Sequence, residues 1–99
     1  MVRWTRSAQI AHEKVPQAMK WAKETAEFAN KKYKTQITVY MDFFGEVGTI
    51  RWFNDYTDLA AFEKVRSQLL ADQEYFQRLT QAADLLVQGS GFDTVMHTI

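Results

Sequence analysis

The sequence of 99 residues contains no cysteine. It therefore has no disulfide framework, no thiolate metal site and no cysteine nucleophile. Net charge is also absent, since 12 Lys and Arg balance 12 Asp and Glu, so composition predicts no nucleic-acid or membrane partner. No apolar run approaches the ~20 residues of a membrane-spanning helix. The polar start MVRWTRSAQ does not resemble a signal peptide, and we expect a cytoplasmic protein.

Motifs for phosphates and metals are missing as well. The glycines of Gly45-Glu46-Val47-Gly48 fit a hairpin turn and not a phosphate-binding loop. The only two histidines, His12 and His97, are far apart and have no close carboxylate at ligand spacing. The sequence therefore predicts neither a metal nor a cofactor.

What is present predicts a folded chain. The composition is 46% hydrophobic and 14% aromatic, which is enough for one core, and we expect a single domain over residues 1–99. Side-chain alternation predicts strands, and apolar residues three and four apart predict helices. Asp55 or Thr57 is expected to cap the second helix, and Asp72 a helix restart. The expected strands cover 2–10, 36–44, 47–54 and 92–99, and the expected helices cover 16–33, 58–70 and 73–88. The turn of the central hairpin is either the two residues Gly45-Glu46 or the four residues Gly45 to Gly48, in which case the third strand begins at 49.

This order is β–α–β–β–α–β. It predicts an α+β ferredoxin-like fold, a four-stranded antiparallel sheet with helices on one face only. In the central hairpin, pairing of Tyr40 with Arg51 separates two faces. The expected core face carries Ile37, Val39, Met41, Phe43, Ile50 and Trp52. The other face carries Thr38, Tyr40, Asp42, Phe44, Val47, Thr49, Arg51 and Phe53.

The second face is too apolar to be left in water. Large exposed apolar patches mark interfaces, and an identical partner with twofold symmetry is the commonest solution. We therefore predict a homodimer in which sheets pack face to face. Phe44, Val47 and Phe53 are expected in its seam.

Two segments resemble a known superfamily. They are the strand-to-helix passage WFNDYTDLAAFE, residues 52–63, and the helix restart LADQEYF, residues 70–76. Both are similar to dimeric α+β barrel proteins, in particular the NIPSNAP-like and antibiotic-biosynthesis-monooxygenase-like groups. The resemblance implies facing sheets that enclose a cavity. Oxygenases of this superfamily use an asparagine on the first strand, a tryptophan on the third and a histidine on the second helix. Of these three residues, the resemblance finds a counterpart only for the tryptophan, at Trp52.

Five residues are candidates for ligand binding. Tyr40, Asp42 and Arg51 converge on the second face, where Arg51 could hold a carboxylate or enolate, or could pair structurally with Asp42. Arg6, in a central strand, needs a carboxylate such as Asp42 or Asp93, or an anionic ligand. His97 could serve as a general base or have a structural role. The sequence leaves open which face the first and last strands turn toward the cavity.

These observations favour a homodimer that binds a small anionic or aromatic organic molecule between the two sheets. One alternative is a cofactor-independent monooxygenase or isomerase, in which Arg51 polarises the substrate and His97 or Asp42 accepts a proton. Another is a structural or interaction domain whose seam is completely filled.

Overall fold

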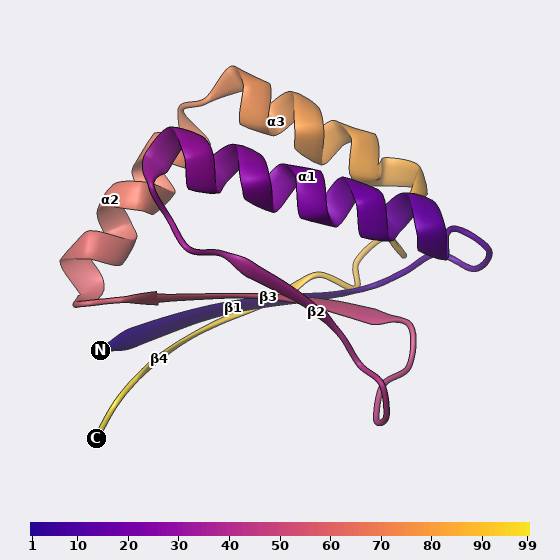
Figure 1. The fold of residues 1–99 in the computed structure, drawn as a ribbon, viewed down its shortest axis with the longest axis horizontal. Helices are drawn as coiled ribbons and strands as arrows, with labels where there is room; N and C mark the ends of the chain where they lie inside the picture. The colour runs from indigo at the N-terminus through magenta and orange to yellow at the C-terminus, as the bar shows by residue number, and fades with distance from the viewer.

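A computed structural model describes residues 1–99 and shows a four-stranded sheet with helices on one face (Figure 1). The arrangement confirms the predicted α+β ferredoxin-like fold. One short 3₁₀ turn, η1, follows the last α-helix. The elements are β1 (Val2–Gln9), α1 (Val15–Tyr33), β2 (Thr38–Met41), β3 (Thr49–Tyr56), α2 (Leu59–Leu70), α3 (Gln73–Thr80), η1 (Gln81–Asp84) and β4 (Phe92–His97).

All neighbouring strands are antiparallel, in the order β2-β3-β1-β4. Tyr40 lies opposite Arg51, which is the pairing expected for the central hairpin. Paired residues point to the same face, so the register also orients β1 and β4. Arg6 pairs with Trp52 and with Asp93, which places all three on the face covered by helices.

The hairpin loop is longer than either expected turn, because β2 ends earlier than expected. β2 ends at Met41 and β3 begins at Thr49, so the intervening residues form a loop. Gly45 and Gly48 both have φ of +90°, which favours glycine and turns the chain out of the sheet. Phe43 was expected in the core, but it is 87% exposed because it lies on this loop. Phe44 and Val47 are also on the loop and are 86% and 73% exposed.

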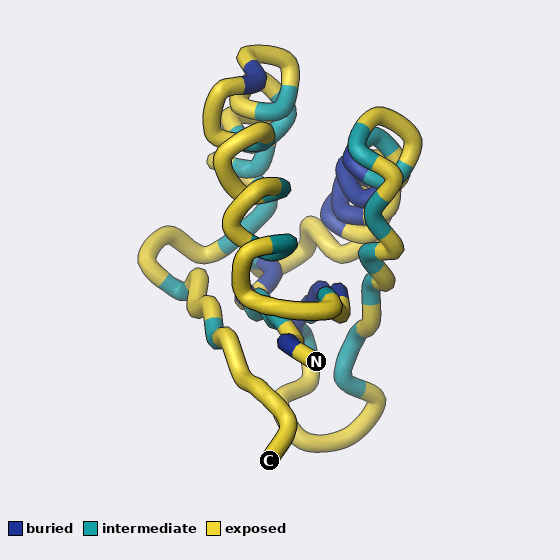
Figure 2. Tube along the Cα trace, turned by 90° about the vertical axis from the view of Figure 1, so that its left-hand side faces the viewer, coloured by how far each residue is buried: buried dark blue, intermediate teal, exposed yellow.

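The first helix begins with Pro16 in its first turn, as expected. Apolar residues three and four apart predict that this helix buries a stripe of Val15, Ala18, Met19, Ala22, Ala26, Ala29 and Tyr33. The four alanines of that stripe are buried, whereas Val15 and Met19 are exposed. Trp21 and Thr25 are buried beside the alanines, so the helix is rotated toward Trp21 relative to that expected stripe. Figure 2 shows the resulting line of buried positions along one side of α1.

Aspartate side chains cap the other two helices. The cap of α2 is Asp58, whose carboxylate accepts from the N–H of Ala61 at 2.8 Å, and not Asp55 or Thr57. Asp55 is instead occupied by Arg3 on the neighbouring strand. Asp72 caps α3 as predicted, accepting from the N–H of Tyr75 at 3.0 Å.

The Asp72 side chain also ties α3 to the end of α1. It accepts a hydrogen bond from the hydroxyl of Tyr33 and forms a 2.7 Å ion pair with Lys32. The hydrogen bond from Lys32, together with those from Tyr33 and the Tyr75 backbone, holds the pKa of Asp72 well below its usual range. This carboxylate is therefore ionised wherever the protein is folded under ordinary conditions.

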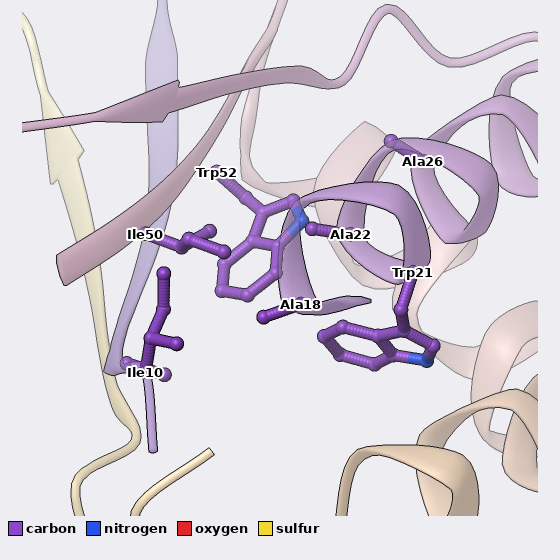
Figure 3. Packing of buried hydrophobic residues seen from close by; sticks show 8 residues of the cluster. Ile10, Ala18, Trp21, Ala22, Ala26, Ile50 and Trp52 are labelled. Atoms are coloured by element: carbon purple, nitrogen blue, oxygen red, sulfur yellow. The ribbon is translucent and has the colours of Figure 1, made fainter. Parts of the chain in front are cut away.

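The core lies between α1 and the sheet (Figure 3). Ile50 is completely buried, and Trp21 of α1 meets Trp52 of β3 edge to face with ring centroids 5.9 Å apart. Ile10 closes the cluster beyond the end of β1. The indole rings of Trp21 and Trp52 lie between α1 and the sheet. The buried residues that follow along α1 include Ala22, Ala26 and Ala29.

Candidate ligand-binding cavity

A cavity of about 450 Å³ lies between the helices and the sheet. We call it the main lobe. Its walls come from β1, β3 and β4 below and from α1, α3 and η1 above. Its lining is mostly apolar and comprises Trp4, Arg6, Ala8, Trp21, Thr25, Ala26, Ala29, Ile37, Trp52, Tyr75, Leu79, Ala82, Leu86, Gly91 and Asp93.

A smaller space of about 170 Å³, the side lobe, adjoins the main lobe beneath α2. The two lobes share Arg6, Tyr75 and Asp93 among their lining residues. The rest of the side lobe is lined by Trp4, Ile37, Tyr56 and Leu79 and by Phe62, Val65, Arg66, Leu69 and Leu70 of α2. Arg6 and Asp93 therefore lie where the two lobes meet.

Small side chains on α1 leave the main lobe open. Ala26 and Ala29 face the sheet, and Ala8 lies on the strand below them. A run of alanines along one side of a helix predicts that the helix can lie close against the sheet. In the structure, Trp21 and Trp52 separate the two layers, so the alanines border a cavity instead. An alanine stripe next to tryptophans is the signal that could have predicted it.

The boundary between the lobes is built on Arg6 and Asp93. Arg6 Nε and Nη2 donate to the two carboxylate oxygens of Asp93 at 2.7 and 2.9 Å, and neither bond uses Nη1. The Arg6 side chain is 36% exposed although helices cover its face of the sheet, because it borders both lobes. Asp42 and Asp93 were the expected partners of Arg6, and in the structure the partner is Asp93.

Aromatic residues surround this pair. Arg6 lies over the ring of Trp4 at 5.4 Å, and Trp4 Nε1 donates to Asp93 at 3.4 Å. Asp93 raises the pKa of Arg6, with Tyr75 adding to the effect, so the guanidinium stays charged. Burial raises the pKa of Asp93, but its hydrogen bond with Arg6, aided by Trp4 and Arg66, keeps that pKa below the usual value. The lobe boundary therefore holds a fixed positive group beside a fixed negative one.

The helix wall of the main lobe carries one polar group without a partner. Thr25 is 7% exposed, and its hydroxyl makes no hydrogen bond within the chain. One turn earlier, Trp21 Nε1 donates to the carbonyl oxygen of Arg78 at 2.6 Å and fixes α1 to α3. Thr25 is a residue that the sequence analysis did not select.

The open face of the sheet carries the other predicted group. Arg51 Nε and Nη2 donate to Asp42 at 2.7 and 3.0 Å, and Nη2 also reaches Glu46 at 3.4 Å. The hydrogen bond from Arg51 lowers the pKa of Asp42, so both partners are charged. Tyr40 packs edge to face on Phe53 with centroids 5.3 Å apart. The Asp42–Arg51 ion pair is the structural alternative that the sequence left open for Arg51.

The five candidate ligand residues therefore divide between the two faces. Tyr40, Asp42 and Arg51 lie together on the open face, whereas Arg6 lines the helix-side cavity. His97 pairs with Val2, which orients it toward the helix side, but it is exposed at the end of β4 and lines neither lobe. The structure does not bring Arg51 and His97 to one site.

Comparison with known proteins assigns the family. A family model described as NIPSNAP matches residues 5–96, nearly the whole chain. The chain belongs to the NIPSNAP family. Comparison with curated proteins found no match. No helix of this NIPSNAP chain is both long enough and apolar enough to span a bilayer.

Solved structures show the same fold at low sequence identity. A NIPSNAP domain protein from Burkholderia xenovorans has a TM-score of 0.83 and 16% identity, with 100% of this chain and 95% of that chain covered. A NIPSNAP family protein from Agrobacterium tumefaciens has a TM-score of 0.81 and 14% identity, with coverage of 99% and 92%. A protein named antibiotic biosynthesis monooxygenase has a TM-score of 0.74 and 13% identity, with coverage of 100% and 99%. These likenesses show the fold, and the family match over residues 5–96 confirms the NIPSNAP-like group that the sequence suggested.

Proposed function

We propose that this NIPSNAP protein binds an organic anion with an aromatic or otherwise apolar body in the helix-side cavity. The supporting observation is the main lobe of about 450 Å³, apolar over most of its lining and bordered by Arg6. Ligand sites typically combine apolar walls with a few polar groups that fix orientation. Three tryptophans, Trp4, Trp21 and Trp52, supply flat surfaces for a ring.

Arg6 is the anchor for the anionic group. Asp93 uses Nε and Nη2, so Nη1 is left to donate to a ligand carboxylate or enolate. Arg66, which lines the side lobe and lowers the pKa of Asp93, adds a second positive charge. Arg6, Arg66 and Asp93 together carry one net positive charge, which favours an anion at the lobe boundary.

Fluorescence of 8-anilinonaphthalene-1-sulfonate tests this proposal, because the probe combines an aromatic body with one anionic group. We expect saturable enhancement with quenching of tryptophan fluorescence. Ala26→Phe fills the main lobe and should abolish both signals while circular dichroism stays native. Ala60→Phe, at an exposed position of α2, is the matched control and should bind normally. Equal binding by the two variants would contradict a site in the main lobe.

We also propose that a second copy covers the open face of the sheet. Tyr40, Phe44, Phe92 and Met96 are large apolar side chains exposed near its two edges. The same face carries two ion pairs, Arg3 with Asp55 and Arg51 with Asp42. Because each pair is neutral overall, two copies could face each other there without repulsion between like charges. These features support the homodimer that the sequence predicts, with the ligand cavity on the helix side of each copy.

Light scattering tests the assembly. Phe53→Glu places a charge beside Tyr40 on the open face and should convert dimer to monomer with a native circular dichroism spectrum. Leu59→Glu makes the same change at an exposed position of α2 and should leave a dimer. A parent protein that is monomeric at all accessible concentrations would refute this proposal.

A second candidate function is cofactor-independent oxygenation or isomerisation of an aromatic ligand in the same cavity. Trp52 lines the main lobe, and a monooxygenase shares the fold, which together favour this candidate. The test is oxygen uptake with 1,4-naphthohydroquinone. Uptake that depends on the protein and falls in Trp52→Phe supports catalysis, whereas uptake at the uncatalysed rate argues for binding alone.

A further inference from the structure

The two lobes of the cavity lie under different helices. Residues of α1 line only the main lobe, whereas residues of α2 line only the side lobe. Strands β1 and β4 and helix α3 contribute to both lobes. A ligand that fills both lobes therefore extends in two directions from the segment of wall that they share.

The shared wall carries the charged groups of the cavity. Arg6 and Asp93 line both lobes from the sheet, and Tyr75 of α3 lines both from the helix layer. The guanidinium contacts other residues of this shared wall, because it pairs with Asp93 and lies over the ring of Trp4 at 5.4 Å. The group that we assign as the anion anchor thus stands between the two lobes.

The lobes differ in the size of the group that they can hold. Pockets for small molecules typically measure about 300–1,000 Å³. The main lobe, of about 450 Å³, falls in this range, whereas the side lobe, of about 170 Å³, does not. Apart from Arg66, the residues that α2 contributes to the side lobe are apolar, and the ring of Phe62 meets that of Tyr56 edge to face at 5.4 Å. The side lobe therefore suits one ring or a short hydrocarbon arm of a larger molecule.

We infer that the ligand carries its anionic group at an internal position, between a larger apolar arm in the main lobe and a smaller one in the side lobe. This inference rests on the proposed function, because it concerns the same cavity and takes Arg6 as the anchor. A ligand with its acid at one end places its apolar body in one lobe and leaves the other lobe to water. A second arm buries more apolar surface without a second charge, so the ligand with two arms is bound more tightly.

Three aromatic acids test this arrangement. The carboxylate of diphenylacetic acid lies between two rings, that of its isomer 4-biphenylacetic acid lies beyond both rings, and phenylacetic acid has only one ring. Calorimetric titration into the full chain measures the affinity for each acid. Diphenylacetic acid should bind at least about tenfold more tightly than phenylacetic acid, because burial of a phenyl ring contributes more than one tenfold step in affinity.

Substitutions in the two lobes locate the second ring. Val65→Phe adds bulk to the side lobe, so it should remove the advantage of diphenylacetic over phenylacetic acid and leave the affinity for 4-biphenylacetic acid unchanged. Ala26→Phe fills the main lobe and should weaken the binding of all three acids. Ala60→Phe, at an exposed position of α2 outside both lobes, should change none of them. Leu69→Phe fills the side lobe from the next turn of α2 and replaces Val65→Phe if that variant lacks a native circular dichroism spectrum.

The outcomes separate this inference from the proposed function. Equal affinity of the parent for diphenylacetic and phenylacetic acids, or an equal effect of the side-lobe substitution on the two isomers, overturns the internal position of the anion and leaves the cavity proposal standing. The same holds if none of the acids binds but 8-anilinonaphthalene-1-sulfonate does. Absence of binding by all three acids and by 8-anilinonaphthalene-1-sulfonate overturns the cavity proposal itself.

Discussion

Arg6 and Asp93 form a two-point ion pair between β1 and β4, on the sheet face that the helices cover. The pair joins the edge strand β4 to the centre of the sheet and separates the two lobes of the cavity. A charge inside an apolar site needs a partner, and here Asp93 pairs with Nε and Nη2 of the guanidinium.

Asp93→Asn should therefore weaken the fold. Arg6 and Asp93 are both more than one third exposed, so solvent screens the pair and the expected loss is about 1 kcal/mol of unfolding free energy. Urea unfolding measures this loss. Asp55→Asn breaks the corresponding pair with Arg3 on the open face and is the control, for which we expect a smaller change. An equal or larger change at Asp55 would show that the position of the Arg6–Asp93 pair is unimportant.

Ile50→Ala tests the core. Ile50 is fully buried beside Trp52, and its truncation leaves a cavity in addition to the lost burial of apolar surface. We expect a loss of about 2–5 kcal/mol in the free energy of unfolding. Leu59→Ala, at a position 54% exposed on α2, should change stability far less. Comparable losses at both positions in urea unfolding would contradict the location of the core.

Thr25→Val should stabilise the protein without ligand. The substitution keeps the shape of the side chain and removes a hydroxyl that has no partner in the folded state. We expect an increase of about 1 kcal/mol in the free energy of unfolding, the lower end of the range for an unsatisfied buried group. Thr80→Val is the control, because the Thr80 hydroxyl donates to the carbonyl of Phe76 at 2.9 Å. A destabilised Thr25→Val would indicate that the hydroxyl has a partner after all.

Acid unfolding should depend on Asp72. Its pKa is lower in the folded state than in the unfolded chain, so its stabilising contribution is present above the unfolded-state pKa of ~3.9. The contribution is lost as pH falls below that value toward the folded-state pKa. Asp72→Asn can still cap α3 but carries no charge, so its melting temperature should be lower at pH 7 and should fall less steeply in acid.

The matched control for Asp72→Asn is Asp84→Asn. Asp84 lies in η1 and takes part in none of the ion pairs described above. Thermal melts between pH 7 and acid conditions, followed by circular dichroism, compare the two variants with the parent. Parallel melting curves for Asp72→Asn and the parent over this range would argue against the Asp72 link between α1 and α3.

The order of elements, the register of the central hairpin and the cap at Asp72 were predictable from the sequence. These features have local causes, since strand alternation, helical spacing and capping residues act within a few positions of the chain. Phe43 shows where this reasoning stops. Alternation assigned it to the core, but β2 ends at Met41, so Phe43 lies on the exposed loop that contains Gly45 and Gly48.

The cavity and the role of its polar groups were decided by tertiary structure. The alternating pattern of β1 placed Arg6 among apolar neighbours, but only the packing of layers shows the space beside it. That space depends on where bulky and small side chains of distant segments meet, with Trp21 on Trp52 and Ala26 beyond them. Whether Thr25 has a partner depends in the same way on groups far away in the chain. Sequence periodicity specifies the face of each element, whereas a cavity depends on how the faces fit together.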